Sequence, residues 1–271
     1  MKFDAYLAAT RRRSVRSYDG KPLSEEHRAL IVKFIEELKN PFGTKTEFVF
    51  LNAAEHSLSS PVLTGETEFV AIKTPKAENF EAGYGFAAES LILYLWSLGI
   101  GSVWIGGTMN RASFERAAKL QPNELMPCMT PIGYAAKHMS VREALMRKGV
   151  KADARKPFEE LAFNESFAAP LDVNGTGSLR ASFEMLRRAP SAVNKQPWRV
   201  VKQGDVFHFY EKRDKGYIKP ETGDLQRIDV GIALCHFWLG AQANGLAPSL
   251  ILREPDIAKP EDVVYVASVR I

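Results

Sequence analysis

The fold of this chain is decided by two similar apolar stretches, GFAAESLILYLWSLG at residues 85–99 and GIALCHFWLGAQANG at residues 231–245. Each would be apolar on nearly every side of a helix, which is the pattern of a central helix rather than a surface one. Each closes with a glycine, Gly99 or Gly245, a residue suited to the left-handed conformation that ends many helices. The stretches therefore predict two long buried helices, from about residue 85 to 98 and from about residue 231 to 243.

The two stretches belong to a longer repeat. A predicted helix over 24–38 and a strand over 48–51 precede the first stretch. A predicted helix over 178–188 and a strand over 198–201 precede the second. Helix, strand and long helix thus recur about 150 residues apart, which indicates two related halves fused in one chain. Such a fusion reproduces the two-fold arrangement of a homodimer, although chance similarity of two α/β segments is the alternative.

The remaining elements predict an α+β fold in which each half has a mixed or antiparallel sheet and a long buried helix. We expect further strands at 69–72, 102–105, 126–134, 206–210, 249–252 and 263–269, and a short helix at 111–120. Residues 137–174 show little periodicity and are interpreted as the connection between the halves, with no argument for or against a lid. The predicted halves are 1–165 and 166–271, packed as an intramolecular pseudo-dimer.

Composition restricts the class of protein. The 271 residues are 45% hydrophobic and 25% charged, an ordinary globular mixture that supplies a sizeable core. The net charge of +4 is smaller than the basic excess of most nucleic-acid-binding proteins, so no nucleic-acid partner is expected. The sequence shows neither a signal peptide nor an apolar run of membrane-spanning length, and Cys128 and Cys235 have no companions at metal-ligand spacing. We expect a cytoplasmic protein without metal, in which both thiols are core residues.

Four segments carry candidate chemistry. Arg12-Arg13-Ser14-Val15-Arg16 offers forked cationic donors that suit a phosphate, although a solvated basic turn is an equal alternative. Residues 190–198, PSAVNKQPW, present polar side chains in a loop held between two prolines, suited to the polar edge of a planar ring. Residues 104–107, WIGG, allow backbone to approach a ligand closely. Residues 155–161, RKPFEEL, taken alone are typical of a charged surface turn.

Together these segments resemble the nitroreductase family, in particular its single-chain members with two fused halves. The resemblance rests on Arg-x-Ser-x-Arg at 12–16, Leu-Gly-x-Gly at 98–101, Trp-Ile-Gly-Gly at 104–107, Gly-Tyr at 133–134, Arg-Lys-Pro-x-Glu-Glu at 155–160 and Pro-Ser-x-x-Asn-x-Gln-Pro-Trp at 190–198. It covers most of residues 1–165 and, more loosely, residues 177–252. It implies a nitroreductase-like fold and an FMN-dependent oxidoreductase.

The resemblance also implies the residues of the flavin site. The phosphate of FMN would be held by the Arg-x-Ser-x-Arg segment and by Arg155 or Lys156. Ser191 and Asn194 would face the isoalloxazine, and the Gly106 and Gly107 amides would lie near flavin N5. The predicted cofactor-binding set is Arg12, Arg13, Ser14, Arg16, Ile105, Gly106, Gly107, Arg155, Lys156, Pro190, Ser191, Ala192, Asn194 and Gln196. No side chain is expected to act as an obligatory acid or base.

The two halves lack complementary motifs. Where the Pro-Ser-x-x-Asn loop is expected in the first half, residues 40–47 read NPFGTKTE. The second half has no Arg-x-Ser-x-Arg, and residues 248–251, PSLI, stand where Trp-Ile-Gly-Gly is expected. In dimers of the family one flavin site combines motifs from both subunits. The resemblance therefore implies one intact site, one FMN per chain, and a weak preference for a monomer over a homodimer.

The expected activity is a ping-pong hydride transfer in which NADH or NADPH reduces FMN and a small-molecule electron acceptor, such as a nitroaromatic or quinone, is then reduced. Two alternatives stay open. One is a non-catalytic flavin-binding protein, a carrier or sensor, and the other is a related flavin enzyme with different chemistry. The sequence does not identify the acceptor and does not distinguish NADH from NADPH.

Overall fold

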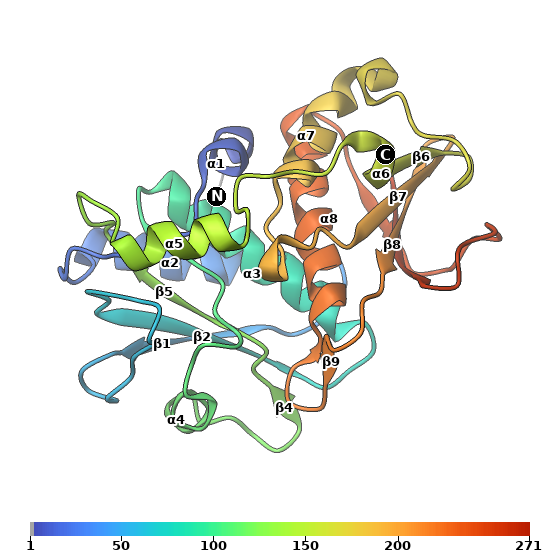
Figure 1. Ribbon diagram of the computed structural model, residues 1–271. Helices are drawn as coiled ribbons and strands as arrows, with labels where there is room; N and C mark the ends of the chain where they lie inside the picture. The colour runs from blue at the N-terminus through green and yellow to red at the C-terminus, as the bar shows by residue number, and fades with distance from the viewer. Residues whose placement is uncertain (1–2) are drawn as a thin grey trace.

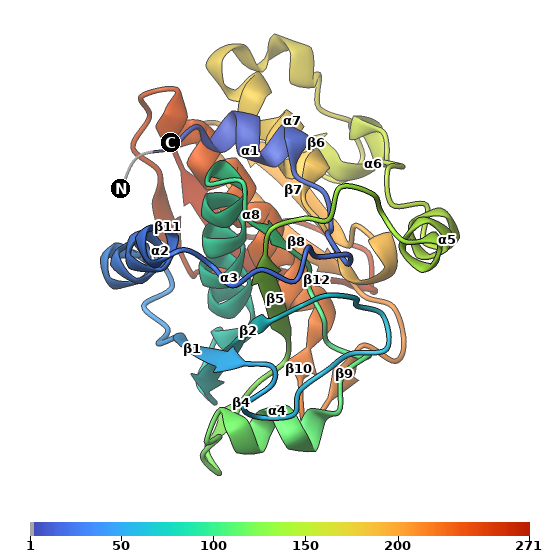
Figure 2. The same cartoon turned by 90° about the vertical axis from the view of Figure 1, so that its left-hand side faces the viewer.

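Two long helices lie between two β-sheets in the computed structural model, which describes residues 3–271 (Figure 1). The helices are α3 (Phe80–Ser97) and α8 (Leu225–Ala243), and they lie side by side at the centre of the molecule (Figure 2). Both predicted buried helices are confirmed, but each begins earlier than its apolar pattern. Gly83 and Gly85 weaken the helical signal at the start of α3, and Arg227 and Asp229 interrupt the apolar pattern of α8.

The central helices touch at two glycines. A methyl group added to Gly85 would lie 2.2 Å from the carbonyl oxygen of Ile228, and one added to Gly231 would lie 2.1 Å from that of Ala82. Each glycine thus meets the carbonyl three residues before the other glycine, so the two contacts are related by a pseudo-two-fold axis. This close backbone approach explains why both helices carry glycine at corresponding positions.

The first sheet is antiparallel and belongs to the N-terminal half. Its order is β1 (Glu47–Asn52), β2 (Glu68–Pro75), β5 (Met129–Gly133) and β3 (Gly101–Ser102), and β4 (Glu124–Leu125) pairs with the end of β2. Strand β2 is buried on both faces. Val70 and Ile72 pack in the core with α3, whereas Phe69 and Ala71 face a second cluster that includes Phe114 of α4 (Arg111–Ala117).

The second sheet repeats this arrangement. Its order is β7 (Trp198–Gln203), β8 (Val206–Lys212), β12 (Val263–Arg270) and β11 (Ser249–Ile251), all antiparallel. The spatial order β1-β2-β5-β3 therefore corresponds strand for strand to β7-β8-β12-β11. This correspondence confirms the predicted α+β pseudo-dimer of two related halves.

Shorter elements complete the fold. They are α1 (Ala5–Arg11), α2 (Glu25–Glu37), the 3₁₀ turns η1 (Val173–Leu179) and η2 (Ala192–Asn194), α7 (Arg180–Arg188), β9 (Ile218–Lys219) and β10 (Gly223–Asp224). Helix α2 confirms the helix predicted over 24–38 and is capped by Ser24, whose hydroxyl accepts a hydrogen bond from His27 N. Across residues 3–271, none of the helices has both the length and the apolarity that a membrane span requires.

Residues 137–174 contain more structure than their weak periodicity predicts. They form α5 (Val141–Gly149), α6 (Phe158–Leu161) and β6 (Ala162–Asn164), and β6 joins the second sheet parallel to β7. The segment interpreted as the connection between the halves is therefore itself partly folded. Its elements are short and depend on tertiary contacts, which leave little trace in sequence periodicity. Because β6 precedes residue 165, the second sheet takes its edge strand from the predicted first half, and the boundary at 165 stays a prediction.

The predicted strand at 102–105 is also shorter than expected. Regular pairing covers only Gly101 and Ser102, and Ile105 makes an isolated bridge to Met129. The chain leaves the sheet at Trp104, whose indole Nε1 donates to the buried carboxylate of Glu89 at 2.8 Å. A tertiary hydrogen bond has thus replaced the last part of the strand.

Candidate functional site

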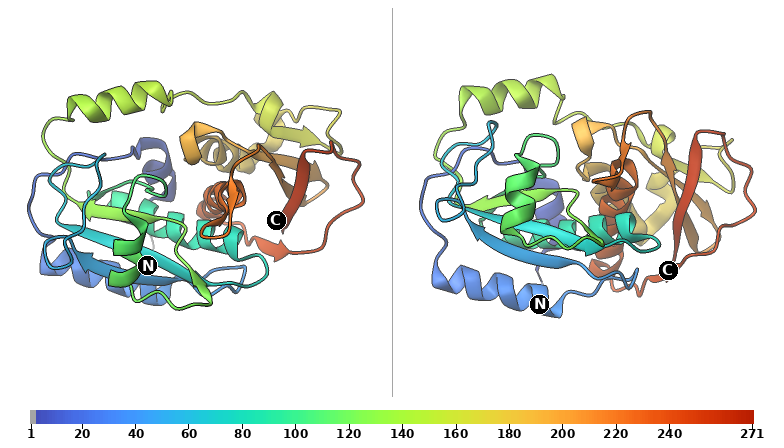
Figure 3. Two further views of the ribbon diagram at one scale, coloured as in Figure 1. Left: turned by 60° about the horizontal axis from the view of Figure 1, so that its bottom comes forward. Right: turned by 90° about the horizontal axis from the view of Figure 1, so that it is seen from below.

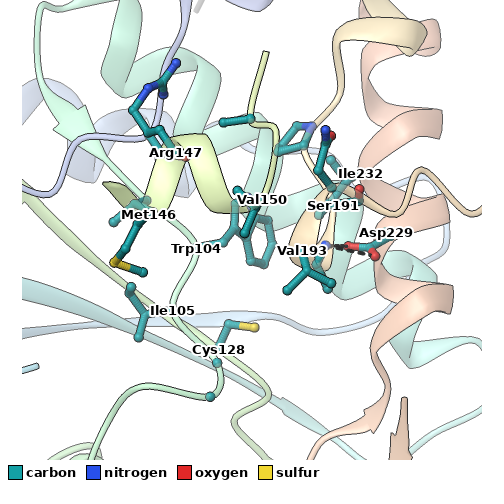
Figure 4. A pocket seen from close by; sticks show the side chains of 18 of the residues that line it. Trp104, Ile105, Cys128, Met146, Arg147, Val150, Ser191, Val193, Asp229 and Ile232 are labelled. Atoms are coloured by element: carbon teal, nitrogen blue, oxygen red, sulfur yellow. Dashed lines mark hydrogen bonds between the residues drawn. The ribbon is translucent and has the colours of Figure 1, made fainter. Parts of the chain in front are cut away.

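A cavity of about 370 Å³ lies at the junction of the two halves (Figure 4). This volume is within the range of ordinary ligand pockets. Its walls include twelve of the fourteen predicted cofactor-binding residues, namely Arg12, Arg13, Ser14, Arg16, Ile105, Gly106, Gly107, Arg155, Pro190, Ser191, Ala192 and Asn194. Segments far apart in the sequence, from both halves, are therefore brought to one cavity.

Arginines at one end of the cavity have unused donors. Within the described part of the chain, Nε and Nη1 of Arg12, Nε of Arg16 and Nε of Arg155 are buried without a hydrogen-bond partner. An unpaired buried donor costs free energy, more so when the group is charged. These orphaned guanidinium atoms show that this end of the cavity suits a bound anion.

The electrostatics of this end agree with that conclusion. Burial, together with the positive charges of Arg12 and Arg188, lowers the pKa of Arg155 to about 10. Burial also lowers the pKa of Arg16, although the nearby carboxylate of Glu143 acts in the opposite direction. The cationic groups are thus held close together out of water, and an anion of the size of a phosphate would relieve their repulsion.

A buried carboxylate holds two residues of the cavity wall in place. Glu89 of α3 accepts hydrogen bonds from Trp104 Nε1 at 2.8 Å and pairs with His236 Nε2 of α8 at 2.9 Å. It also lies 3.7 Å from Nε of Arg12. The other ring nitrogen of His236 meets the carbonyl of Met185 at 2.9 Å. Glu89 therefore holds a cavity arginine and a cavity tryptophan while it joins the two central helices.

Sequence reasoning missed Glu89 although a signal was present. It is the only charged residue in the predicted buried helix at 85–98. A carboxylate in such a helix requires a partner, because burial of an unpaired charge is costly. The partner, His236, lies in the corresponding helix of the other half and could not be assigned from spacing.

The loop at 190–196 is held in a strained form. Val193, Asn194 and Gln196 have φ angles of 44°, 59° and 52°, in the left-handed region that non-glycine residues avoid. Ser191 Oγ accepts from Gln196 N at 2.9 Å, and the amide of Asn194 donates to the carbonyls of Lys151 at 2.7 Å and Ala154 at 3.1 Å. The Asn194 side chain thus fastens the segment after α5.

The loop is also anchored to a carboxyl group that sequence reasoning missed. The backbone N–H of Ala192 donates to both carboxyl oxygens of Asp229, each at 3.1 Å. Asp229 belongs to the first turns of α8 and lines the cavity. Its signal in the sequence was a single acidic residue just before an apolar helical stretch.

The glycine segment presents bare backbone to the cavity. Ile105 is fixed by paired backbone hydrogen bonds with Met129 at 3.0 and 2.9 Å. Arg111, which the sequence did not mark, donates to the carbonyls of Met126, Gly106 and Pro127. A methyl group on Gly107 would meet no atom within 4 Å, so the space beside this residue is open. A ligand can therefore approach the backbone here without side-chain obstruction.

Helix α5 covers part of the cavity and lies apart from the two sheets (Figure 3). Its Glu143 side chain is buried, lies 3.0 Å from Nη1 of Arg13 and accepts from the hydroxyl of Ser17 at 2.8 Å. Met146 and Val150 of this region line the cavity. Arg13 is thus a cavity residue whose charge is already paired with α5.

Two predicted residues lie outside this cavity. Lys156 and Gln196 line a neighbouring hollow instead. Nζ of Lys156 pairs with Glu160 at 2.6 Å, and the Gln196 side chain accepts from Lys156 N at 2.9 Å. Because these polar groups bind each other, the structure does not bring them to the other predicted ligands.

The corresponding place in the first half is filled by protein. Gly83 lies two residues before Gly85, as Asp229 lies two residues before Gly231. A methyl group on Gly83 would lie 1.9 Å from Oγ1 of Thr44, and Asn40 Nδ2 donates to the Gly83 carbonyl at 3.1 Å. The segment that lacks the Pro-Ser-x-x-Asn motif therefore packs directly onto the helix.

The comparisons with known proteins agree with this fold. The family model described as "Putative TM nitroreductase" matches residues 4–241. The crystal structure of a "putative nitroreductase" from Thermotoga maritima MSB8 is 19% identical, covers 100% of this chain and 94% of its own, and superposes with a TM-score of 0.63. No curated protein matches the chain.

Shorter solved structures also match. An FMN-dependent nitroreductase from Clostridium difficile R20291 is 20% identical over 53% of this chain and 95% of its own, with a TM-score of 0.42. A "putative NADH oxidase" from Clostridium acetobutylicum is 21% identical over 50% of this chain and 90% of its own, also with a TM-score of 0.42.

The fold and the cavity between its halves define a protein of nitroreductase-like architecture. Because the family model spans most of its length, the chain belongs to the family described as putative TM nitroreductases, and the predicted resemblance is confirmed.

Proposed function

We propose that this protein binds one FMN in the cavity between its halves and transfers electrons from NADH or NADPH to a small acceptor. The observation that carries the proposal is the set of buried guanidinium nitrogens of Arg12, Arg16 and Arg155 that lack partners at one end of this cavity. A phosphate would satisfy these donors with charge-assisted hydrogen bonds. Membership of the nitroreductase family supports FMN as the bearer of that phosphate.

The same geometry divides the predicted ligands into two groups. Arg12, Arg16 and Arg155 would bind the phosphate, with Ser14 beside them. The ring would lie against Ser191 and the bare backbone of Gly106 and Gly107.

Four further predicted residues would support the site, since their polar groups are already bound to protein. Arg13 is paired with α5, and Asn194 holds the segment after α5. Gln196 and Lys156 bind each other. These residues would fix the walls of the site without touching the cofactor.

Bound FMN would supply the hydride chemistry, accepting two electrons from a nicotinamide and passing them on. The protein supplies the cavity that both substrates would enter in turn, as a ping-pong cycle requires. Its walls include the apolar side chains of Val62, Trp104, Ile105, Met146, Val150 and Ile232. Such a wall suits a flat acceptor such as a nitroaromatic or a quinone.

We also propose that the complete site is made within one chain. Both halves contribute to the cavity, and the corresponding place in the first half is filled by Thr44 against Gly83. One FMN per chain and a monomer are expected, in the cytoplasm.

The test is to measure FMN bound per chain and the bleaching of its visible absorbance by NADH and NADPH. Close to one FMN per chain is expected, together with bleaching by at least one nicotinamide. Arg16→Ala should weaken FMN binding about tenfold to one-hundredfold, because a hydrogen bond to a charged group contributes roughly 1.5–3 kcal/mol. Arg11→Ala is the matched control, since Arg11 is exposed and lies outside the cavity wall.

The other outcomes distinguish the alternatives. Tight FMN binding without bleaching by either nicotinamide would favour a carrier or sensor. Two FMN per chain would contradict the single composite site, and equal loss of affinity in Arg16→Ala and Arg11→Ala would contradict the phosphate assignment.

A further inference from the structure

Asp229 is a carboxyl group in the wall of the proposed flavin site. Its side chain is 4% exposed and lines the cavity from α8 (Figure 4). Both carboxyl oxygens share a single backbone donor, the N–H of Ala192, at 3.1 Å. One N–H divided between two oxygens compensates a buried negative charge only weakly. In a neutral carboxylic acid, the carbonyl oxygen can accept this one hydrogen bond while the other oxygen keeps its proton.

The groups around Asp229 add negative charge. Asp224, which caps α8 through Gln226 N and Arg227 N, and Glu211 of β8 are both buried. Arg213 lies 3.5 Å from Asp224 and 3.3 Å from Glu211, and the positive charge of Arg227 also acts on Glu211. Cys128 and Tyr217 also face this group from other segments, and neither supplies positive charge.

These surroundings favour the protonated form of Asp229. Burial raises its pKa well above the usual value, and the carboxylates of Asp224 and Glu211 raise it further, whereas the Ala192 hydrogen bond acts in the opposite direction. Burial and Asp224 likewise raise the pKa of Glu211 to about 7. Because the pKa values of Asp229 and Glu211 are both raised, these two carboxyl groups retain protons at neutral pH despite the arginines nearby.

We propose that Asp229 is the proton donor to the electron acceptor, which rests on the proposed function. A quinone that takes up a hydride gains two electrons and one proton. Reduced FMN would supply this hydride and would be oxidised. The resulting hydroquinone anion needs a second proton. Asp229 donates its carboxyl proton to that oxygen, becomes a carboxylate, and is reprotonated from water. Ser191, Asn194 and the arginines have no proton of comparable acidity to give.

The first test is independent of turnover. At pH 8, where Glu211 is largely ionised, the FMN-free protein should show the infrared carbonyl band of a protonated carboxylic acid, and Asp229→Asn should remove that band. Asn retains the shape and an oxygen that accepts from Ala192 N, so the loop at 190–196 should stay in place. A band that persists in Asp229→Asn, or that is absent from the wild type, would overturn the proposal.

The second test separates proton transfer from electron transfer. FMN-loaded protein is reduced with dithionite and mixed with a benzoquinone or with ferricyanide, which takes electrons without a proton. Asp229→Asn should slow quinone reduction by roughly 100-fold, the lower range for a positioned general acid. Ferricyanide reduction should slow far less, so that the ratio of the two rates falls. Equal effects on both acceptors, or none on the quinone, would show that Asp229 has only a structural role.

A charge variant tests the cluster. In the wild type, quinone reduction should slow as rising pH removes the Asp229 proton. Asp224→Asn keeps an N-cap for α8 but removes a negative charge, so it should move this loss to lower pH. An unshifted profile would contradict the coupling. Dithionite replaces the nicotinamide in these experiments. If NADH and NADPH failed to bleach the protein, the proposed reductant would be refuted, but the role of Asp229 would still be tested.

Discussion

At the scale of single residues, this protein places charges where their partners are missing or shared. Arg12, Arg16 and Arg155 hold unpaired donors in the wall of the cavity, and Glu211 and Asp224 lie close to the cavity residue Asp229. The sequence shows all of these residues, but only the fold shows which charges are compensated. Uncompensated buried charge is typical of functional sites, because it destabilises the folded protein and would not be retained for stability alone.

Glu211 gives a prediction for the dependence of stability on pH. Its pKa is about 7 in the folded protein against an ordinary value of 4.5, so the folded state binds a proton that the unfolded state releases. The free energy of unfolding should therefore fall as pH rises from about 4.5 to 7. Replacement by Gln should remove about 2 kcal/mol of this loss, measured by urea unfolding at pH 5 and pH 8.

The control for this prediction is Glu254→Gln. Glu254 pairs with Lys259 at the surface, and its side chain is half exposed, so its removal should change stability little at either pH. If Glu211→Gln lowered stability equally at pH 5 and pH 8, Glu211 would be ionised in the folded protein throughout that range.

At the scale of elements, the contact between α3 and α8 holds the two halves together. Gly231→Ala places a methyl group 2.1 Å from the Ala82 carbonyl oxygen, so the helices must separate. We expect destabilisation of about 3 kcal/mol, at the upper end for overpacking a core, measured by urea unfolding. Gly149→Ala is the matched control, because Gly149 ends α5 with no atom within 4 Å of the added methyl. If Gly231→Ala were as stable as the wild type, the helices would not touch there.

Because helix α5 lines part of the cavity, we predict that its attachment governs access to the site. Glu143→Ala removes its bonds to Arg13 and Ser17, so α5 should detach more often. FMN dissociation should accelerate about tenfold, as loss of a charged hydrogen bond implies, and trypsin should cleave sooner near Arg147. The measurements are FMN release after dilution and limited proteolysis.

Leu145→Ala is the control on the same helix, since Leu145 is 65% exposed and points away from the core. It should change neither rate. Unaltered FMN release in Glu143→Ala would show that α5 does not restrict the site.

At the scale of the whole molecule, the two halves share one interior. Residues of both central helices and of both sheets belong to a single core cluster, and β6 from the first predicted half extends the second sheet. We therefore expect one cooperative unfolding transition, coincident by circular dichroism and tryptophan fluorescence, and a rise in its midpoint temperature when FMN is added. Two separate transitions would show that the halves fold independently.

The sequence predicted the long-range architecture better than the local connections. Residues 85–98 and 231–243 were recognised because a helix buried on all sides needs a long apolar run. Helix α5, the three-residue strand β6 and the break at Trp104 were not, since each depends on one or two tertiary contacts such as Glu143 with Arg13. The sequence predicted the repeat but no strand order, and the parallel edge strand β6 of the second sheet was not predicted.

The sequence by itself determined the class of fold, its internal pairing and the segments that approach the cavity, because periodicity, glycine spacing and motif composition are local properties. The tertiary structure alone decided which side chains are free. It shows Arg13, Lys156 and Gln196 occupied by protein partners, Asp229 in the cavity wall, and Glu89 in contact with the wall residues Arg12 and Trp104. The physical reason is that burial and charge pairing join residues more than one hundred positions apart, and such contacts leave no pattern along a single chain.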